Sequence, residues 1–309
     1  MLQHVPVLLE EVLGALNVRA GGRYVDATFG RGGHTAAILE RVGKEGRVIA
    51  IDRDPAAVAA GRERFAAENR LTLVESPFSR LHEIVAERGW LGGIDGVLLD
   101  LGVSSPQLDD AARGFSFIQD GPLDMRMDSS SGMTAAQFIA RAPERELARI
   151  IRDYGEERFA KRVARAIVAA RLAAPITTTG RLAEIVSDAV PTREPGKHPA
   201  TRTFQALRIH INDELAQVEA GLAGALEVLA PGGRLCAISF HSLEDGIVKR
   251  FMQKHSQDDP VYAGLPDIPD HARAKLKRVG KAIRPSEAEV ARNPRARSAI
   301  MRVAEKVAA

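Results

Sequence analysis

The fold is decided by one segment near the start of the chain, Val25-Asp26-Ala27-Thr28-Phe29-Gly30-Arg31-Gly32-Gly33-His34-Thr35. Residues 23–26 predict a short strand, the glycines predict a turn, and a helix is expected from Thr35. Glycine lets the backbone approach a ligand closely, and the first N–H groups of a helix are free to bind it. The segment therefore predicts a nucleotide-binding turn.

A second segment completes this pattern. Residues 46–51 predict another strand, and Asp52 follows at its carboxyl end, where the hydroxyl groups of a ribose would lie. Glycine turns after strands also occur without any ligand. An acid at the end of the next strand, about 20 residues further on, makes that alternative much the weaker one.

The acid that ends the first strand distinguishes two classes of cofactor. A dinucleotide-binding fold places glycine directly after this strand, so that a pyrophosphate can lie at the helix N-terminus. Here Asp26 stands at that point. A carboxylate repels a pyrophosphate but suits a cofactor that carries an amino group and a sulfonium. The sequence therefore favours S-adenosylmethionine over a nicotinamide dinucleotide.

Composition describes a globular protein with a large core. The chain has 309 residues, of which 45% are hydrophobic and 27% are charged. No apolar run approaches the roughly 20 residues that a membrane span needs, and the N-terminus has no signal-peptide pattern. Cys236 is the only cysteine, so no disulfide framework is expected. We expect a soluble, cytoplasmic protein without membrane association.

Charge is unevenly distributed along the chain. Residues 246–309 carry 14 Lys/Arg against 7 Asp/Glu, whereas residues 1–105 carry 12 against 14. A basic tail on a nearly neutral body suits a polyanionic partner. A merely solvated basic surface explains the charge equally well.

Strands and helices then alternate. A third strand is predicted at residues 71–76, and Phe78 behind it is a candidate for the apolar face of an adenine, with core packing as an equal alternative. Residues 94–100 predict a buried strand that ends at Asp100 and a small-residue loop. This alternation predicts a doubly wound α/β sheet with functional loops at the carboxyl strand ends.

The pattern changes to helices in the middle of the chain. Helices are expected at 135–140, 144–154, 158–171 and 180–189, with no strand between them. We therefore expect a small helical domain inserted into the sheet, with the core at 1–108 and 204–309 and the insertion at 109–203.

After the insertion, a long helix is predicted to run to about Leu229. A tight turn at 230–233, a strand at 233–240, a helix with Ser242 as its N-cap, and a last strand from Arg295 are expected to follow. At the N-terminus, residues 4–16 predict an extended piece and a helix, which either cover the cofactor cleft or simply pack on the core.

Several long strings carry a resemblance to a known family. The strings are DATFGRGGHT, AIDRDP, GVLLDLGVSSPQLDDAARGFSF, GPLDMRM, YGEERFAKRVARAI, HPATRTFQALRI, LAPGGRLCAISFHSLED and NPRARSA. With these strings, the sequence resembles the bacterial methyltransferases that modify the N4 amine of a decoding-centre cytosine in 16S ribosomal RNA, from His4 to about Val303. The resemblance implies a class I, Rossmann-like methyltransferase core with an inserted all-helical domain.

The resemblance also implies which residues bind S-adenosylmethionine. Gly32, Gly33 and His34 would line its methionine end, and Asp52 would hold the ribose hydroxyls. Phe78, Asp100 and Gln107 would complete the adenine and methionine contacts. Thr28 replaces the glycine that class I enzymes usually have there, a change that is typical of this family.

The catalytic residue is expected at the end of the fourth strand. Many amine methyltransferases place an acid or amide followed by prolines at the fourth strand end, whereas this chain has Asp100-Leu-Gly-Val. Asp100 is the catalytic candidate, and its role toward the cofactor, the target amine or both stays open. His241 either steers the base or caps a helix. His34, Asp52 and Glu244 lack the spacing of metal ligands, so no metal is expected.

The expected partner is 16S ribosomal RNA within the small ribosomal subunit. The target base must leave its stack, and Lys197, Arg202, Arg208 and the basic tail are candidates for phosphate contacts, although each could equally be a surface charge. The sequence does not determine the form of the RNA substrate or the oligomeric state, so a homodimer stays open. A nicotinamide-dependent dehydrogenase and a non-catalytic ribosome-assembly factor are the competing hypotheses.

Overall fold

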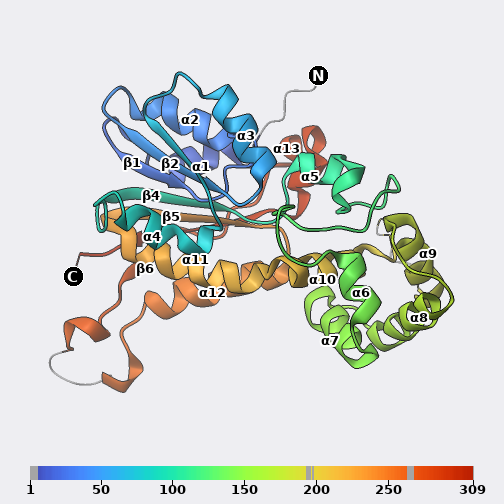
Figure 1. Cartoon of the computed structure of the whole chain (residues 1–309). Helices are drawn as coiled ribbons and strands as arrows, with labels where there is room; N and C mark the ends of the chain where they lie inside the picture. The colour runs from blue at the N-terminus through green and yellow to red at the C-terminus, as the bar shows by residue number, and fades with distance from the viewer. Residues whose placement is uncertain (1–5, 193–195, 197, 263–267, 309) are drawn as a thin grey trace. The chain divides into compact units, whose positions relative to one another are not determined.

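The computed structural model describes residues 6–192, 196, 198–262 and 268–308 (Figure 1). The chain divides into two compact units. Residues 1–102 and 215–309 form a sheet unit, and residues 103–214 form a helical unit. The predicted insertion, 109–203, lies inside the helical unit.

The sheet unit contains one seven-stranded sheet in the order β3-β2-β1-β4-β5-β7-β6. Strands β1 to β5 are parallel, and β7 runs antiparallel to both β5 and β6. The strands are β1 (Arg23–Asp26), β2 (Arg47–Asp52), β3 (Leu71–Glu75), β4 (Ile94–Asp100), β5 (Leu229–Ser239), β6 (Leu276–Arg278) and β7 (Ile300–Lys306). This order confirms the predicted doubly wound α/β fold and places its switch point between β1 and β4.

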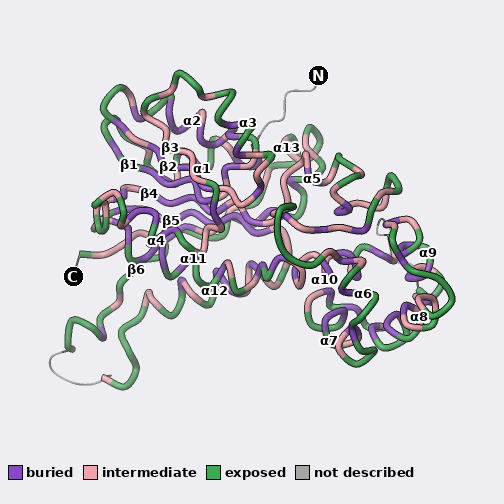
Figure 2. Tube along the Cα trace, in the orientation of Figure 1, coloured by how far each residue is buried: buried purple, intermediate pink, exposed green. Residues whose placement is uncertain are grey.

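Helices cover both faces of this sheet, which explains why its central strands are apolar at almost every position. Neighbouring residues of one strand point to opposite faces. Tyr24 packs with α1 (Leu9–Ala15) and α2 (Gly33–Val42), whereas Val25 packs with α4 (Leu81–Ala86), α11 (Glu214–Val228) and α12 (Ser242–His255). Figure 2 shows the resulting buried traces of β1, β2, β4 and β5.

The remaining helices of the sheet unit are short. They are α3 (Pro55–Arg64), α13 (Glu287–Arg292), and the 3₁₀ turns η1 (Phe78–Arg80), η3 (Pro260–Tyr262), η4 (Asp270–Ala272) and η5 (Pro294–Ser298). Asp54 caps α3 by accepting the N–H of Ala56 at 3.0 Å, and Pro55 occupies the first turn, where its missing N–H costs nothing. None of the described helices has the length and hydropathy that crossing a bilayer requires.

Two details of the sheet differ from the sequence prediction. The tight turn predicted at 230–233 falls within β5, where Ile94 pairs with Leu229 and Gly96 already pairs with Arg234. The intervening residues of β5 form an irregularity rather than a separate turn. The last strand begins at Ile300 rather than Arg295, because Pro294–Ser298 form a 3₁₀ turn.

The helical unit has its own apolar core, drawn from all of its longer helices. Its elements are α5 (Ser105–Asp109), η2 (Ala111–Arg113), α6 (Ala135–Arg141), α7 (Glu144–Gly155), α8 (Ala160–Ala173), α9 (Thr179–Ala189) and α10 (Thr201–Asn212). Four of these confirm the helices predicted between 135 and 189.

The prediction of one long helix that ends near Leu229 is wrong, because the structure has two helices there. Asp213 separates α10 from α11 and has a left-handed backbone with φ of +50°. The buried Asn212 side chain ends α10 by binding a loop: it accepts the N–H of Met127 at 2.7 Å and donates to the carbonyl of Met125 at 2.8 Å. Long-range polar contacts therefore stabilise a break that helix propensity does not indicate.

The role of Asn212 is testable by removing its amide. Asn212→Ala leaves buried backbone groups of the 125–127 loop unpaired, and each such group costs about 1–3 kcal/mol. We expect the free energy of unfolding in urea to fall by roughly 2–4 kcal/mol. Asn69→Ala, at an exposed position, is the matched control and should change it by less than about 0.5 kcal/mol. Equal stability of the two variants would contradict this role.

Candidate functional site

The ends of three adjacent parallel strands each carry an aspartate. Asp26 ends β1, Asp52 ends β2 and Asp100 ends β4. Because β2, β1 and β4 are neighbours and parallel, these carboxylates lie along the same edge of the sheet, at its switch point. This edge is where open α/β sheets bind their ligands.

The glycine turn lies beside these strand ends, and neighbouring side chains pack closely against its backbone. Gly30 and Gly32 have φ of +53° and +70°, which glycine adopts without strain. A Cβ on Gly32 would lie 2.6 Å from the ring of Phe29, and one on Gly33 would lie 2.4 Å from Pro6. The turn therefore requires glycine at both positions, because Phe29 and Pro6 fill the space beside them, and the approach of a ligand to this backbone stays a prediction.

Asp52 binds this turn to the end of β2. Its carboxylate oxygens accept the N–H of Gly30 at 2.7 Å and the N–H of Asp54 at 2.8 Å. Burial raises the pKa of Asp52 to about 6, although the two N–H groups oppose the shift. Each oxygen keeps a second lone pair, so the carboxylate can still accept a ligand hydroxyl.

Asp26 binds residues on both sides of the glycine turn. It is fully buried, and it accepts the hydroxyl of Thr35 at 2.6 Å and the N–H of Thr28 at 3.2 Å. Burial raises the pKa of this carboxyl, and His34 opposes the shift. Because Asp26 has no exposed surface, its visible role is to hold the strand end and the start of α2 through Thr28 and Thr35.

Asp100 is the carboxylate with unused hydrogen-bonding capacity. About a quarter of its side chain is exposed, and Oδ2 lies 3.6 Å from Nδ1 of His34. Oδ1 is buried and has no hydrogen-bond partner in the described part of the chain. Burial raises the pKa of Asp100 to about 6; His34 opposes this shift, whereas Asp26 and Glu244 reinforce it. A donor brought by a ligand would relieve both the missing hydrogen bond and the unfavourable charge.

His34 connects Asp100 to the N-terminal segment. Its Nε2 lies 3.0 Å from the carbonyl oxygen of Val7, and since a carbonyl only accepts, Nε2 donates. Nδ1 then faces Asp100. Pro6 contacts Gly33, and Leu8 donates its N–H to Glu289 at 2.8 Å. Residues 6–8 therefore pack on the glycine turn, and whether they cover a cofactor cleft stays a prediction; residues 4 and 5 lie outside the described part.

Phe78 contacts the core. A Cβ on Gly221 of α11 would lie 2.6 Å from its ring, so the ring packs directly against that helix. The contact matches the core-packing alternative, and the adenine-binding role stays a prediction.

His241, rather than Ser242, is the N-cap of α12. Its Nδ1 accepts the N–H of Glu244, while the buried Glu244 carboxylate accepts the N–H groups of Phe240 at 2.8 Å and His241 at 3.3 Å. This is a capping box with histidine in place of serine or threonine. The glutamate three residues after His241 is the sequence signal that could have identified the cap.

The other predicted residues have structural partners in the helical unit. Gln107 is buried, and its Oε1 accepts the N–H of Ser104 at 2.9 Å in the capping box of α5. Arg208 forms two 2.8 Å hydrogen bonds with the Glu214 carboxylate, and Arg202 donates to the carbonyl of Glu156 at 2.7 Å. Lys197 lies outside the described residues. Gly32, Gly33, His34, Asp52, Phe78 and Asp100 all belong to the sheet unit.

A doubly wound sheet with a glycine turn and carboxylates at its switch point defines a Rossmann-like nucleotide-cofactor enzyme. The chain belongs to the MraW methylase family, whose model matches residues 1–307. It is 57% identical over 305 residues to ribosomal RNA small subunit methyltransferase H of Dechloromonas aromatica (strain RCB), covering 98% of each chain. These matches confirm the resemblance found in the sequence.

Solved structures give weaker similarities. An rRNA methylase from Streptococcus thermophilus aligns with a TM-score of 0.44 and 11% identity, covering 100% of this chain and 99% of that one. A SAM-dependent methyltransferase from Aquifex aeolicus aligns with a TM-score of 0.43 and 10% identity, covering 97% and 90%. At these scores the alignments support no conclusion about the site.

The contact between Gly33 and Pro6 generates a prediction. Gly33→Ala places a methyl group 2.4 Å from Pro6, so the N-terminal segment must move. We expect the free energy of unfolding to fall by roughly 1–3 kcal/mol. Gly14→Ala is the matched control, since Gly14 is an exposed position in α1 with nothing within 4 Å of an added Cβ. The free energy of unfolding of the Gly14→Ala variant should exceed that of the wild type by up to about 1 kcal/mol. Unchanged stability of Gly33→Ala in urea would show that Pro6 does not pack on the turn.

Proposed function

We propose that this protein transfers a methyl group from S-adenosylmethionine to the exocyclic N4 amine of a cytosine in 16S ribosomal RNA of the small subunit. The carboxylate of Asp100 carries the proposal, because it ends β4 at the switch point and has a buried oxygen without a partner. Membership of the MraW methylase family and the similarity to ribosomal RNA small subunit methyltransferase H support the reaction class and the RNA substrate.

The residues present fit the cofactor. Gly32 and Gly33 would present backbone groups to its methionine end, where His34 also lies, and Asp52 would accept the ribose hydroxyls with its remaining lone pairs. Phe78, which follows the end of β3, would contact the adenine, and Asp100 would accept from the ammonium group. When bound, the cofactor supplies an electrophilic methyl carbon on a positively charged sulfur.

Electrostatics favour this cofactor over a dinucleotide. Asp26 is buried and Asp52 and Asp100 are half-buried at one edge of the sheet, and all three have raised pKa values because their charge is desolvated. A cation placed there stabilises the ionised carboxylates, whereas a pyrophosphate would add further negative charge. The nicotinamide-dependent dehydrogenase is therefore the disfavoured alternative.

The chemical step requires orientation of a weak nucleophile. The lone pair of the cytosine amine is delocalised into the ring, so an acceptor for the amine N–H groups must turn it toward the methyl carbon. Asp100 is the acceptor at this strand end. As the N–C bond forms and the S–C bond breaks, the amine loses one proton, which the Asp100 carboxylate can accept. Holding the two reactants in line supplies most of the rate.

The target cytosine must leave its stack to reach a methyl carbon bound at the strand ends. The basic segment 246–309 suits the phosphate backbone of the surrounding RNA. Recognition within the small subunit, a cytoplasmic location and a homodimer remain predictions of the sequence.

Labelled methyl transfer tests this proposal. Purified protein is incubated with methyl-labelled S-adenosylmethionine and small subunits that lack the modification, and the modified nucleotide is mapped by mass spectrometry. We expect label on the N4 atom of one cytosine. Asp100→Asn should lower the transfer rate by roughly 10²-fold or more, because the amide has no negative charge and cannot accept the proton that the amine loses. Glu45→Gln, an exposed carboxylate in the loop before β2, is the control and should transfer at the wild-type rate.

Two results would contradict the proposal in different ways. Wild-type protein that binds small subunits without transferring label is a non-catalytic assembly factor. An Asp100→Asn variant that binds cofactor normally and keeps full turnover removes Asp100 from the chemistry while leaving the enzyme class intact.

A further inference from the structure

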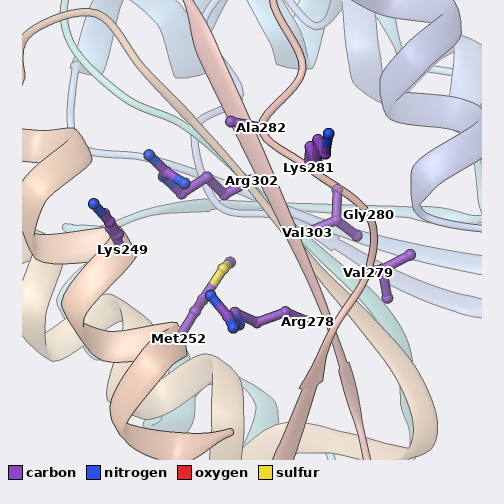
Figure 3. A pocket seen from close by; sticks show the side chains of 9 residues that line it. All are labelled: Lys249, Met252, Arg278, Val279, Gly280, Lys281, Ala282, Arg302 and Val303. Carbon is purple, nitrogen blue, oxygen red and sulfur yellow. The ribbon is translucent and has the colours of Figure 1, made fainter.

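A hollow in the sheet unit is lined by none of the three strand-end aspartates. It occupies about 270 Å³ between α12 and the segment that joins β6 to β7 (Figure 3). Lys249 reaches it from α12, Arg302 from β7, Arg278 from the end of β6, and Lys281 from the loop that follows. We call this feature the basic pocket.

Backbone hydrogen bonds fix both ends of the loop that forms one wall of the pocket. Val279 donates its N–H to the carbonyl of Val303 at 2.9 Å, and Ile283 and Met301 exchange two hydrogen bonds of 2.9 Å. Between these fixed points the chain leaves β7, and Gly280 has φ of +69°. The N–H groups of residues 280–282 donate no hydrogen bond to the described residues, so they remain available to a ligand.

The basic pocket has an excess of positive charge. The positive charge of Arg302 is compensated, because its guanidinium forms hydrogen bonds of 2.7 and 2.8 Å with the Asp245 carboxylate. Lys249, Arg278 and Lys281 have no ion-pair partner among the described residues, and no carboxylate lines the pocket. Three cations and a set of free N–H groups around one hollow are the donors that a phosphate requires.

The lining also indicates what the pocket does not recognise. Apart from its cations it contains only aliphatic residues, Met252 and glycine, with no aromatic ring and no amide or carboxylate side chain. It therefore has no ring on which a base could stack and no side-chain acceptor for a base edge or a ribose hydroxyl. Such a site reads charge and not sequence, which is typical of contacts with a nucleic-acid backbone.

The pairing of β7, β5 and β4 shows how far the basic pocket lies from the strand that ends at Asp100. Arg302 pairs with Ala237 of β5, and Ala237 pairs with Leu99, the residue before Asp100. The two strand spacings between Arg302 and Leu99 amount to roughly 10 Å of backbone separation. The basic pocket and the end of β4 therefore belong to one sheet and lie within the reach of a single RNA segment.

We propose that the basic pocket binds backbone phosphate groups of the RNA substrate and so positions the target cytosine near the end of β4. This inference rests on the proposed function, since it requires an RNA substrate. A free phosphate-bearing small molecule shares the same chemistry, and the experiment distinguishes the two sources.

The experiment compares two full-length double variants with equal loss of charge. Arg278→Ala/Lys281→Ala empties one wall of the pocket, and Lys44→Ala/Arg62→Ala removes two exposed cations elsewhere in the sheet unit. Dissociation constants for small subunits lacking the modification are measured over a range of salt concentrations. The pocket variant should bind about ten-fold more weakly, and the slope of log K against log salt should fall by roughly 1 to 2. The control variant should match the wild type, and both variants should bind S-adenosylmethionine normally, which verifies their folding.

Each other outcome overturns the inference. Equal weakening of both variants would mean that only net charge matters, and unchanged binding by the pocket variant would exclude the pocket from RNA binding. If inorganic phosphate binds the wild type and not the pocket variant, while subunit affinity is the same for both, the pocket serves a free anion. Failure of the proposed function is recognised separately, because wild-type protein would then transfer no label to the subunits.

Discussion

The constraint on which the rest of the structure depends is the burial of three carboxylates at neighbouring strand ends. Desolvation raises the pKa of Asp26, and it raises the pKa values of Asp52 and Asp100 from below 4 to about 6. A carboxyl whose pKa is higher in the folded state than in the unfolded chain binds its proton more tightly when folded. Stability is therefore lost as pH rises from about 4 through 6, and the full cost is present at neutral pH.

The surrounding elements hold these charges in place. Thr35 and the N–H of Thr28 bind Asp26, the glycine turn binds Asp52, and His34 faces Asp100 while its other nitrogen binds Val7. Helices on both faces of the sheet exclude water from the strands that carry them. Among the three carboxylates, Oδ1 of Asp100 is buried and has no hydrogen-bond partner in the described part of the chain, so a positively charged ligand gains most there.

Much of this arrangement could be predicted from the sequence because its signals are local. A strand, a glycine turn and an acid at the next strand end lie within 30 residues, and the strand ends of a parallel sheet must meet at one edge. The break at Asp213 could not be predicted, since it depends on Asn212 binding a loop about 85 residues away. The histidine cap of α12 was missed because histidine is an unusual N-cap, and packing of Phe78 on Gly221 depends on a helix that is distant in the chain.

The central claim is that buried carboxylates select a cationic methyl donor, and calorimetry measures it directly. S-adenosylmethionine and NAD are each titrated into the protein at pH 6 and pH 8, in buffers of different ionisation enthalpy. A cation lowers the raised pKa values of Asp52 and Asp100, so the account predicts that S-adenosylmethionine binds with proton release at pH 6 that declines toward pH 8. NAD should give no binding heat. Uptake of NAD, or binding of S-adenosylmethionine without proton release at pH 6, would contradict it.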